Sequence, residues 1–329
     1  MLVCRRAGPA DLPALRQVRS RWDGPDYVYD ALPAWLEERP GGVYLYEVDG
    51  RVVGFASIAF PKPGEAWLRG KRIDVDDEGR GFGTRSGHFE LAEAVRLGAR
   101  VVRLATAPGP TPATRLVERL GFERLAAWTF AQALDAGPLL EVEERPMAAA
   151  VRPRRLSAGQ WHNARVRLAV QLRIERSVPA SWRSGGSGGG QTGGAAWGLI
   201  AVGHDPWQLA SFGPFDLVDA FQRGEVVTAG DPARPAGVML LCEPEPGEDR
   251  PLLVRHLVGS PPAQGALLAY AAERARARSA KLALSLAAEA CAPLRSRLEA
   301  AGKLYDLDVY QWTDTGRGGA GLAQAHESP

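Results

Sequence analysis

The hydrophobic and polar positions between residues 67 and 105 change period twice, and this change predicts the central elements of the chain. Residues 67–75 read as a strand, and residues 101–105 form a second short apolar run. Between them, apolar side chains recur at helical spacing before Gly98, a typical helix stop; they are Phe89, Leu91, Ala92, Val95 and Leu97. Three glycines at alternate positions, Gly79, Gly81 and Gly83, join the first strand to this helix. The predicted order is therefore strand, glycine-rich turn, helix, strand.

The glycine-rich turn has the features of an anion site. Glycine lets the backbone approach a ligand closely, and the first N–H groups of a helix have no intrahelical partners. Together with the helix dipole, these groups favour an anion such as a pyrophosphate. A tight strand-to-helix turn without a ligand accounts for three spaced glycines equally well. The turn is not a P-loop, because no Gly-Lys-Ser/Thr follows, and it lacks the acidic residue of a Rossmann dinucleotide site.

Residues 112–122 make the interpretation more specific. They predict a short helix that ends at Gly121, followed by an aromatic residue and a strand at 128–134. Here the chain resembles the GNAT superfamily of acetyl-CoA-dependent N-acetyltransferases. The family's cofactor loop reads Arg/Gln-x-x-Gly-x-Gly/Ala, and residues 78–83 (Glu-Gly-Arg-Gly-Phe-Gly) match it except at the first position. A register that starts at Arg80 restores the basic residue but puts Arg85 at the final small position. The family's later helix ends in Leu-Gly-Phe, as residues 120–122 do.

The resemblance implies acetyl-CoA as the cofactor and suggests roles for individual residues. Those that would bind it lie at the strand end and in the loop: Ile73, Val75, Gly79, Arg80, Gly81, Phe82, Gly83 and Thr84. A backbone N–H of the strand would polarise the thioester carbonyl, and Asp74 or Glu65 would take a proton from the amine. Solubility of a strand edge explains both carboxylates more simply. Val117 stands where the family commonly has a tyrosine that protonates the thiolate, and Pro110 replaces an asparagine.

The residues before the loop predict the start of the same fold. Residues 2–6 read as a strand, residues 10–13 open a helix, and residues 23–39 form a second helical region. Asp49-Gly50 joins two strands, 43–48 and 51–58, in a predicted hairpin. We therefore expect an N-terminal GNAT domain over residues 1–137.

The second half of the chain repeats this element order. A predicted linker at 138–150 is followed by predicted strands and helices in the same order. The last of these helices begins at a proline and stops at Gly302, and it corresponds to the helix at 112–121, which stops at Gly121. Where a cofactor loop should lie, residues 259–265 contain Pro261 and Pro262, which lack N–H donors. We therefore expect two tandem GNAT-like domains of the α/β (α+β) class, each a mixed, mostly antiparallel twisted sheet flanked by helices. The second, at 151–314, would be degenerate, with a disordered tail at 315–329.

Composition narrows the partners and the compartment. The 329 residues are 45% hydrophobic and 24% charged, as in soluble globular proteins, and the net charge of +2 gives no indication of nucleic acid binding. Three widely spaced cysteines fit a reducing compartment, and neither a signal peptide nor a membrane-spanning stretch is evident, so we expect a cytoplasmic protein. The histidines and cysteines lack metal-ligand spacing, so no metal is expected.

The hypothesis from the sequence is an acetyltransferase. Its N-terminal domain would move an acetyl group from acetyl-CoA to a primary amine of a small molecule or peptide, by direct attack in a ternary complex. The alternative is a non-catalytic acyl-CoA-binding or interaction protein that kept the fold; a purely structural glycine turn is a third possibility. The acceptor is undetermined, and the chain could be a monomer, as a pseudo-dimer of its two domains, or a homodimer.

Overall fold

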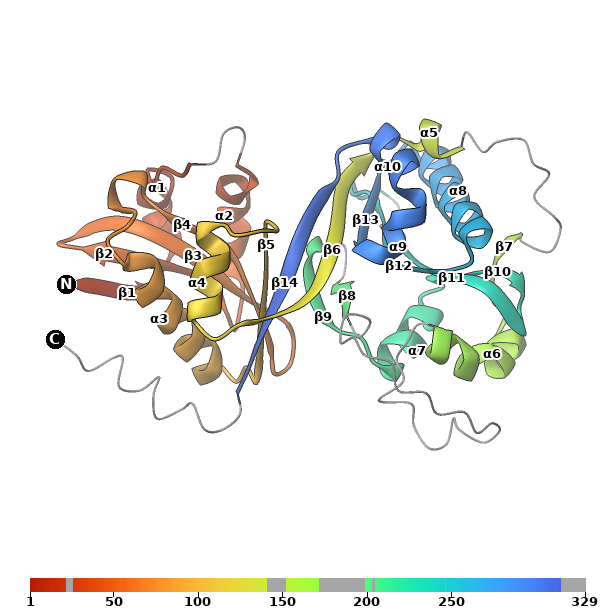
Figure 1. Cartoon of the computed structure of the whole chain (residues 1–329), viewed down its shortest axis with the longest axis horizontal. Coiled ribbons are helices and arrows are strands. Elements are labelled where there is room, and N and C mark those ends of the chain that lie inside the picture. The colour runs from red at the N-terminus through yellow and green to blue at the C-terminus, as the bar shows by residue number, and fades with distance from the viewer. Residues whose placement is uncertain (22–25, 141–151, 172–198, 203–204, 246, 315–329) are drawn as a thin grey trace. The chain divides into compact units, whose positions relative to one another are not determined.

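The computed structural model describes residues 1–329 except 22–25, 141–151, 172–198, 203–204, 246 and 315–329 (Figure 1). The predicted disordered tail and most of the predicted linker lie outside the described residues. The chain divides into two compact units. The N-terminal unit consists of Met1–Leu125 together with the chain end from Asp308, and the C-terminal unit consists of Ala126–Leu307.

The N-terminal unit is a mixed sheet covered by helices on both faces. Its strands, in spatial order, are β1 (Leu2–Arg6), β2 (Gly42–Val48), β3 (Arg51–Lys62), β4 (Glu65–Ile73), β5 (Val101–Thr106) and the part of β14 (Tyr305–Thr313) from Asp308. Its helices are η1 (Pro9–Asp11), α1 (Leu12–Leu15), α2 (Tyr27–Glu37), η2 (Val75–Asp77), α3 (Phe82–Arg96) and α4 (Pro112–Arg119). Neighbouring strands are antiparallel except β4 and β5, which are parallel.

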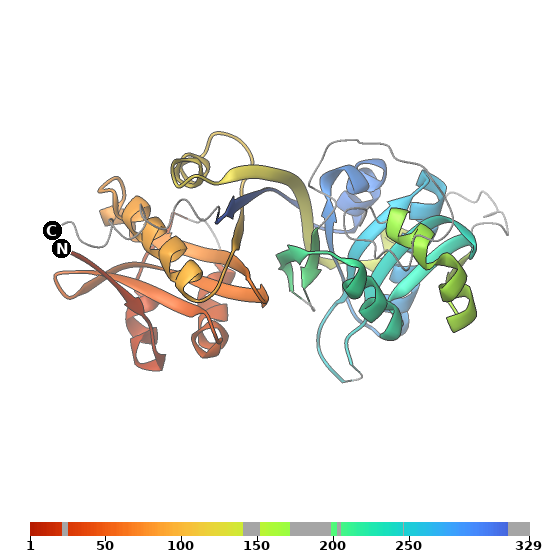
Figure 2. The same cartoon turned by 90° about the horizontal axis from the view of Figure 1, so that it is seen from below.

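The strand β2 is apolar at consecutive positions because both of its faces are buried. Val43 and Leu45 pack with α1 and α2, whereas Tyr44 packs with α3 and α4 on the other face. Figure 2 shows α3, in orange, and the red N-terminal helices on opposite sides of this sheet. The predicted hairpin is confirmed, since Val48 pairs with Arg51 across the turn at Asp49-Gly50.

The C-terminal unit contains a second mixed sheet. Its strands, in spatial order, are β6 (Glu123–Leu134, from Ala126), β13 (Leu282–Ala287), β12 (Leu252–Gly259), β11 (Arg234–Cys242), β10 (Val226–Asp231) and β7 (Pro153–Arg155); β8 (Leu199–Val202) and β9 (Asp205–Ser211) form a separate hairpin. Its helices are α5 (Ala136–Leu140), α6 (Ala158–Gln171), α7 (Pro214–Gln222), α8 (Pro261–Ala277), α9 (Ala288–Cys291), η7 (Ala292–Leu294) and α10 (Arg295–Ala301). The pair β12–β13 is parallel, and β6 is antiparallel to β13.

Most of the last strand, β14, belongs to the N-terminal unit and not to the C-terminal unit that precedes it in the chain. Residues 308–313 of β14 pair with β5 and complete the N-terminal sheet, while residues 128–134 of β6 pair with β13 in the C-terminal sheet. The units therefore divide at Leu125 and Asp308, whereas the sequence placed residues 1–137 in one domain and 151–314 in the other. Alternation of apolar residues marks a strand, but it does not specify the strand's partner, which explains the difference.

Candidate functional site

The loop between η2 and α3 has the backbone that an anion site requires. Gly79 and Gly81 both have φ of +77°, in the left-handed region that favours glycine, and Gly81 is the N-cap of α3. A Cβ on either glycine would meet no atom within 4 Å, so the space beside the loop is open. The first intrahelical bond of α3 runs from Arg85 N to Gly81 O. The N–H groups of residues 82–84 therefore lack helical partners and are available to a ligand.

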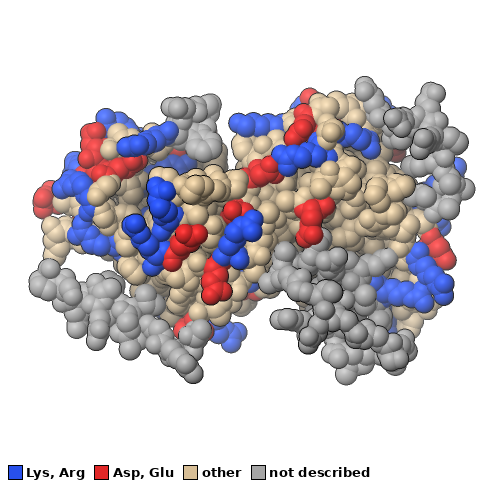
Figure 3. Space-filling view, viewed as in Figure 1, with Lys and Arg blue, Asp and Glu red and all other residues tan. Residues whose placement is uncertain are grey.

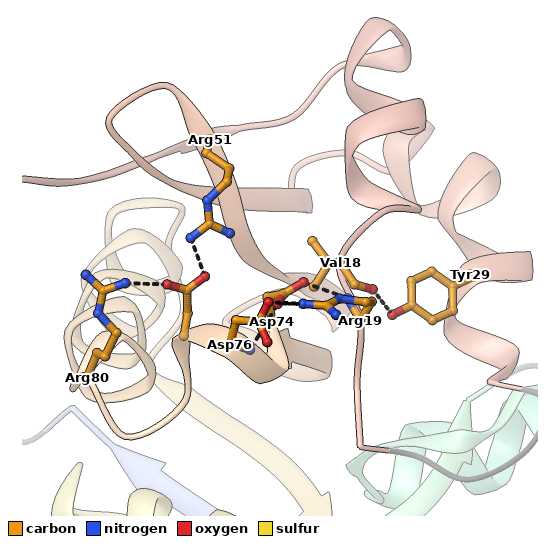
Figure 4. A network of polar contacts seen from close by, with 8 residues as sticks. Val18, Arg19, Tyr29, Arg51, Asp74, Asp76 and Arg80 are labelled. Atoms are coloured by element: carbon orange, nitrogen blue, oxygen red, sulfur yellow. Dashed lines mark hydrogen bonds and ion pairs between the residues drawn. The ribbon is translucent and has the colours of Figure 1, made fainter.

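Arginine side chains flank this loop. Asp77, which is 1% exposed, accepts hydrogen bonds from Arg80 Nη1 and Arg51 Nη2, each at 2.6 Å, and Figure 4 shows both arginines directed at the same carboxylate. The guanidinium carbons of Arg80 and Arg85 each lie 4.9 Å from the centroid of the Phe82 ring. Two cations are thus held beside the open start of α3, where they would attract a phosphate group.

The parallel strands β4 and β5 separate soon after they meet. They pair over only three residues each, Glu65–Trp67 with Val101–Arg103. Beyond Trp67, β4 continues for six residues to Ile73 and β5 for three to Thr106 without further pairing to each other. The backbone N–H and C=O groups on these facing edges are therefore not used by the β4–β5 ladder. The two strands therefore part beyond Trp67 and leave an opening in the ladder between them.

A bulge in β4 accompanies this separation. Gly70 and Lys71 together stand opposite the single residue Ala56 of β3, because the register passes from Arg69↔Ser57 to Arg72↔Phe55. Gly70 has φ of +63°, and a Cβ there would lie 2.6 Å from Cζ3 of Trp35. Only glycine fits this position, and such bulges bend the strand that carries them.

The predicted binding residues 73–84 lie together along one continuous path. Ile73 ends β4 and packs with Phe82 and Tyr46, and Val75 begins η2, its N–H donating to Arg19 O at 3.1 Å. Gly79, Arg80, Gly81, Phe82, Gly83 and Thr84 then form the loop and the first turn of α3. The structure thus brings all eight residues to the end of β4.

Asp74 is a fixed, ionised carboxylate. It accepts hydrogen bonds from Arg19 N, Arg19 Nη2 and Asp76 N at 3.0, 3.0 and 3.1 Å, and Arg19 also pairs with Asp76 (Figure 4). Burial opposes its charged form, but these hydrogen bonds outweigh burial, so the pKa of Asp74 lies below its ordinary value. A carboxylate held in this way accepts a proton poorly at neutral pH.

Glu65 lies at the opposite end of β4 from Asp74. Its carboxylate pairs with Arg103 Nη1 at 2.5 Å, and Arg103 Nε donates to Gln311 Oε1 at 2.8 Å. With a rise of about 3.3 Å per residue, the eight steps from Glu65 to Ile73 span roughly 26 Å. The two predicted catalytic carboxylates are therefore not brought together, and Glu65 sits where β4 and β5 are still paired.

A buried polar cluster under α3 was missed by sequence reasoning. Glu90 is 2% exposed, its Oε1 pairs with Lys71 Nζ at 2.5 Å, and it accepts a hydrogen bond from the Tyr46 hydroxyl. Burial raises the pKa of Tyr46 well above its ordinary value, and the charge of Glu90 adds to the effect. Glu90 falls on the buried line of α3 at i, i+4 spacing with Phe82, Ser86 and Ala94. In the sequence, the glutamate at this spacing was the available sign of a buried polar cluster.

Val117 packs in the core between α4 and the sheet, with Leu120 and Phe122. Its side chain contributes no polar atom there. Pro110 precedes α4, and its carbonyl accepts a hydrogen bond from Arg115 Nη1 at 2.8 Å. Thr111 caps the helix, with Oγ1 accepting from Thr114 N at 3.0 Å.

The corresponding segment of the C-terminal unit differs at the phosphate position. Strands β12 and β13 also pair over only three residues each, Leu252–Val254 with Leu282–Leu284. However, α8 begins with Pro261 and Pro262, so only Ala263 among its first three residues has a backbone N–H. This helix start is poorly suited to hold a pyrophosphate.

Among the described residues, no group of three or more His, Cys, Asp or Glu side chains is arranged to hold a metal ion. His256 is buried, which lowers its pKa to about 4. Within the described ranges, no helix has both the length and the apolar character needed to cross a membrane. The face drawn in Figure 3 carries Lys and Arg interspersed with Asp and Glu.

Comparisons with known proteins agree with this geometry. Residues 11–122 match the model of the Acetyltransferase (GNAT) family. The structure of a GCN5-related N-acetyltransferase from Sphaerobacter thermophilus is similar with a TM-score of 0.54 at 17% identity, over 95% of each chain. A candidate acetyltransferase from Thermoplasma acidophilum matches with a TM-score of 0.50 at 15% identity, over 94% of this chain and 99% of its own. No curated protein matches. At these identities the likeness shows the fold, which is the predicted α/β class.

Proposed function

We propose that the GNAT acetyltransferase domain matched by residues 11–122 binds acetyl-CoA and transfers the acetyl group to a primary amine. The observation that carries this proposal is the opening between β4 and β5, which leads to a loop with open space and free N–H groups. The opening offers an extended amide chain backbone groups that the β4–β5 ladder does not use, and the loop offers donors and arginines to a pyrophosphate. The residues present therefore fit the cofactor.

Each predicted binding residue has a role in this proposal. The N–H groups of residues 82–84 and the side chains of Arg80 and Arg85 would hold the phosphates. The bulge at Gly70 lies in the part of β4 that is not paired with β5, and a backbone N–H of this part would polarise the thioester carbonyl. Direct attack then needs only a neutral amine and a thioester held in line.

The reaction also needs a group or a water molecule that takes the proton from the amine. Asp74 and Glu65 remain the candidates, but the lowered pKa of Asp74 and the ion pair of Glu65 with Arg103 make both weak proton acceptors. This environment favours loss of the amine proton to water. Asp74→Asn and Glu65→Gln test the two carboxylates, because a true base would leave a shifted acid limb in the pH–rate profile.

We also propose that residues 151–314 are a degenerate GNAT-like copy of residues 1–137, joined to it by a linker at 138–150; these copies are defined by their element order in the sequence and differ from the two compact units, which divide at Leu125 and Asp308. The short parallel pair β12–β13 and the helix that follows support this proposal, and Pro261 and Pro262 explain its loss of a cofactor site. The cytoplasmic location, and a monomer or a homodimer, stay predictions.

A second candidate function is acyl-CoA binding without catalysis. It is favoured by Val117, whose buried apolar side chain occupies the position from which family members commonly protonate the thiolate. Binding and turnover must therefore be tested separately.

Calorimetric titration with acetyl-CoA and with free coenzyme A tests binding first. We expect one equivalent to bind the wild type and none to bind Gly81→Val. Gly98→Val is the matched control, because Gly98 also has a left-handed φ and open surroundings but lies at the other end of α3. Absence of binding to the wild type would refute the proposal, and two equivalents would show that the C-terminal unit binds as well. Thiol release with a panel of polyamines, aminoglycosides, amino acids and peptides then distinguishes the enzyme from the binding protein.

A further inference from the structure

Tyr310 brings a phenol from the far end of the chain into the N-terminal unit. It lies on β14, is 2% exposed, and belongs to the core cluster that includes Val117 and Leu68. Its register partner on β5 is Leu104. Directly paired residues of antiparallel strands project from the same face, so Tyr310 lies on the face that α3 and α4 cover.

This position is level with the point where β4 and β5 separate. Arg103 is the last residue of β5 that pairs with β4, and Leu104 is the next one. The phenol lies close enough to Thr114, in the first turn of α4, for the Thr114 side chain to act on its pKa. Thr114 is itself fixed, since its hydroxyl donates to Gly109 O at 2.8 Å. The Tyr310 side chain therefore lies on the α4 side of the sheet, in one cluster with Val117 and level with the point where β4 and β5 separate.

The chemistry of thioester aminolysis gives a hydroxyl at this place a use. When the amine displaces the sulfur, the C–S electron pair goes to sulfur, and a proton donor nearby stabilises the departing thiolate. Val117 on α4 has no proton to give. Burial raises the pKa of Tyr310, with Asp308 and Glu118 adding to the effect and the Thr114 hydrogen bond opposing it. The phenol is therefore protonated at neutral pH and can act as a donor.

We propose that the Tyr310 hydroxyl is the proton donor to the leaving sulfur of acetyl-CoA, an inference that rests on the proposed function. The amine nitrogen bonds to the carbonyl carbon, the C–S bond breaks, and the O–H proton of Tyr310 passes to sulfur, giving the free thiol. Water then reprotonates the phenolate, and the proton lost from the amine passes to water. The C-terminal end of the chain thus supplies a catalytic residue to the N-terminal unit.

A pair of ligands tests this contact without a known acceptor. Coenzyme A carries the thiol, whereas desulfo-coenzyme A lacks only the sulfur. For the full-length wild type we expect tighter binding of coenzyme A than of desulfo-coenzyme A. In Tyr310→Phe, loss of one hydrogen bond should weaken coenzyme A binding by roughly three- to tenfold and leave desulfo-coenzyme A binding unchanged.

Tyr44→Phe is the matched control, because Tyr44 is a buried tyrosine of the same core cluster whose hydroxyl donates to Glu93 instead. It should not alter the preference for coenzyme A. Thermal unfolding of both variants reports whether each keeps its fold. Equal affinities of the wild type and Tyr310→Phe for coenzyme A would overturn the assignment of Tyr310 while leaving the proposed function intact. If the wild type bound neither ligand, the proposed function would fail, and the assignment with it.

The protonation state of the bound thiol gives a second readout. A hydrogen bond from Tyr310 stabilises the thiolate, so the pKa of bound coenzyme A should be lower in the wild type than in Tyr310→Phe. Ultraviolet absorbance of the thiolate across a pH titration measures this difference directly. The same pKa in both proteins would contradict the proposed donor.

Discussion

Arg124 Nη2 donates to Asp308 Oδ1 at 2.6 Å and joins two residues that are 184 positions apart in the chain. Nearby, Arg103 Nε donates to Gln311 Oε1 at 2.8 Å, and Asp314 N donates to Arg100 O at 2.9 Å. Six residue pairs between β5 and β14 lie among these contacts. Since Arg124 is half exposed, its ion pair contributes no more than about 1 kcal/mol, and burial of the strand is the larger effect.

Deleting the last strand should therefore unfold the N-terminal unit. A chain that ends at Leu304 loses the buried side chains of Val309 and Tyr310, and core truncations of this size cost about 3 kcal/mol or more. Hydrogen exchange at the amides of β5 measures the effect, because they should lose protection. A chain that ends at Asp314 keeps β14 and is the control. Full protection of β5 in the shorter chain would contradict the pairing.

Gly70 should not tolerate a side chain. In Gly70→Ala, the left-handed φ and the clash with Trp35 together should cost about 2–4 kcal/mol in the free energy of unfolding. Gly50→Ala is the control for φ alone, because Gly50 has φ of +79° and open space around it. Denaturant unfolding of the single variants and of the double variant Gly70→Ala/Trp35→Leu separates the cost of the left-handed φ from the cost of the clash with Trp35. No recovery in the double variant would show that the contact with Trp35 is not limiting.

The Asp74 carboxylate should stabilise the folded protein at neutral pH, and this stabilisation should be lost in acid. Its folded pKa lies below the unfolded value of 3.8, so its contribution is present above about pH 3.8 and is lost as the pH falls through the folded pKa. Asp74→Asn should be less stable than the wild type at neutral pH, and the difference should shrink in acid. Thermal unfolding as a function of pH tests this. Asp49→Asn, in an exposed hairpin turn, controls for the loss of a carboxylate, and a pH-independent difference for Asp74→Asn would argue against the linkage.

The ion pair between Lys71 and Glu90 should be costly to break from one side. Lys71→Met leaves the Glu90 carboxylate buried without its cation, which typically costs about 3–5 kcal/mol. Adding Glu90→Gln should restore most of that stability, since the buried charge is then gone. Denaturant unfolding measures both variants. If Lys71→Met alone were as stable as the wild type, the carboxylate would have to be neutral or hydrated in the fold.

The local features of the site could be predicted, but their tertiary partners could not. The loop was identified from three glycines, Gly79, Gly81 and Gly83, that lie between a strand pattern and a helical pattern. Glycine is the residue that left-handed backbone conformations favour, so its positions in the sequence indicate such a turn directly. The buried line of α3 instead runs through Ser86 and Glu90, which a hydrophobic period passes over. Gly70 within a strand was a usable sign of the bulge. Nothing near Tyr310 indicates β5 as its neighbour, because strand pairing over two hundred residues has no local signal.

The pairing of β14 with β5 also sets an order of events during protein synthesis. Strand β5 leaves the ribosome early, yet its outer edge stays bare until residues 308–313 follow, and a bare edge is a template for unwanted pairing. The C-terminal unit ends at Leu307, so all of its residues are synthesised before those that complete the N-terminal unit. A chain that terminated before residue 308 would carry the glycine loop without Tyr310, so translation must pass β14 before the protein has the proposed proton donor.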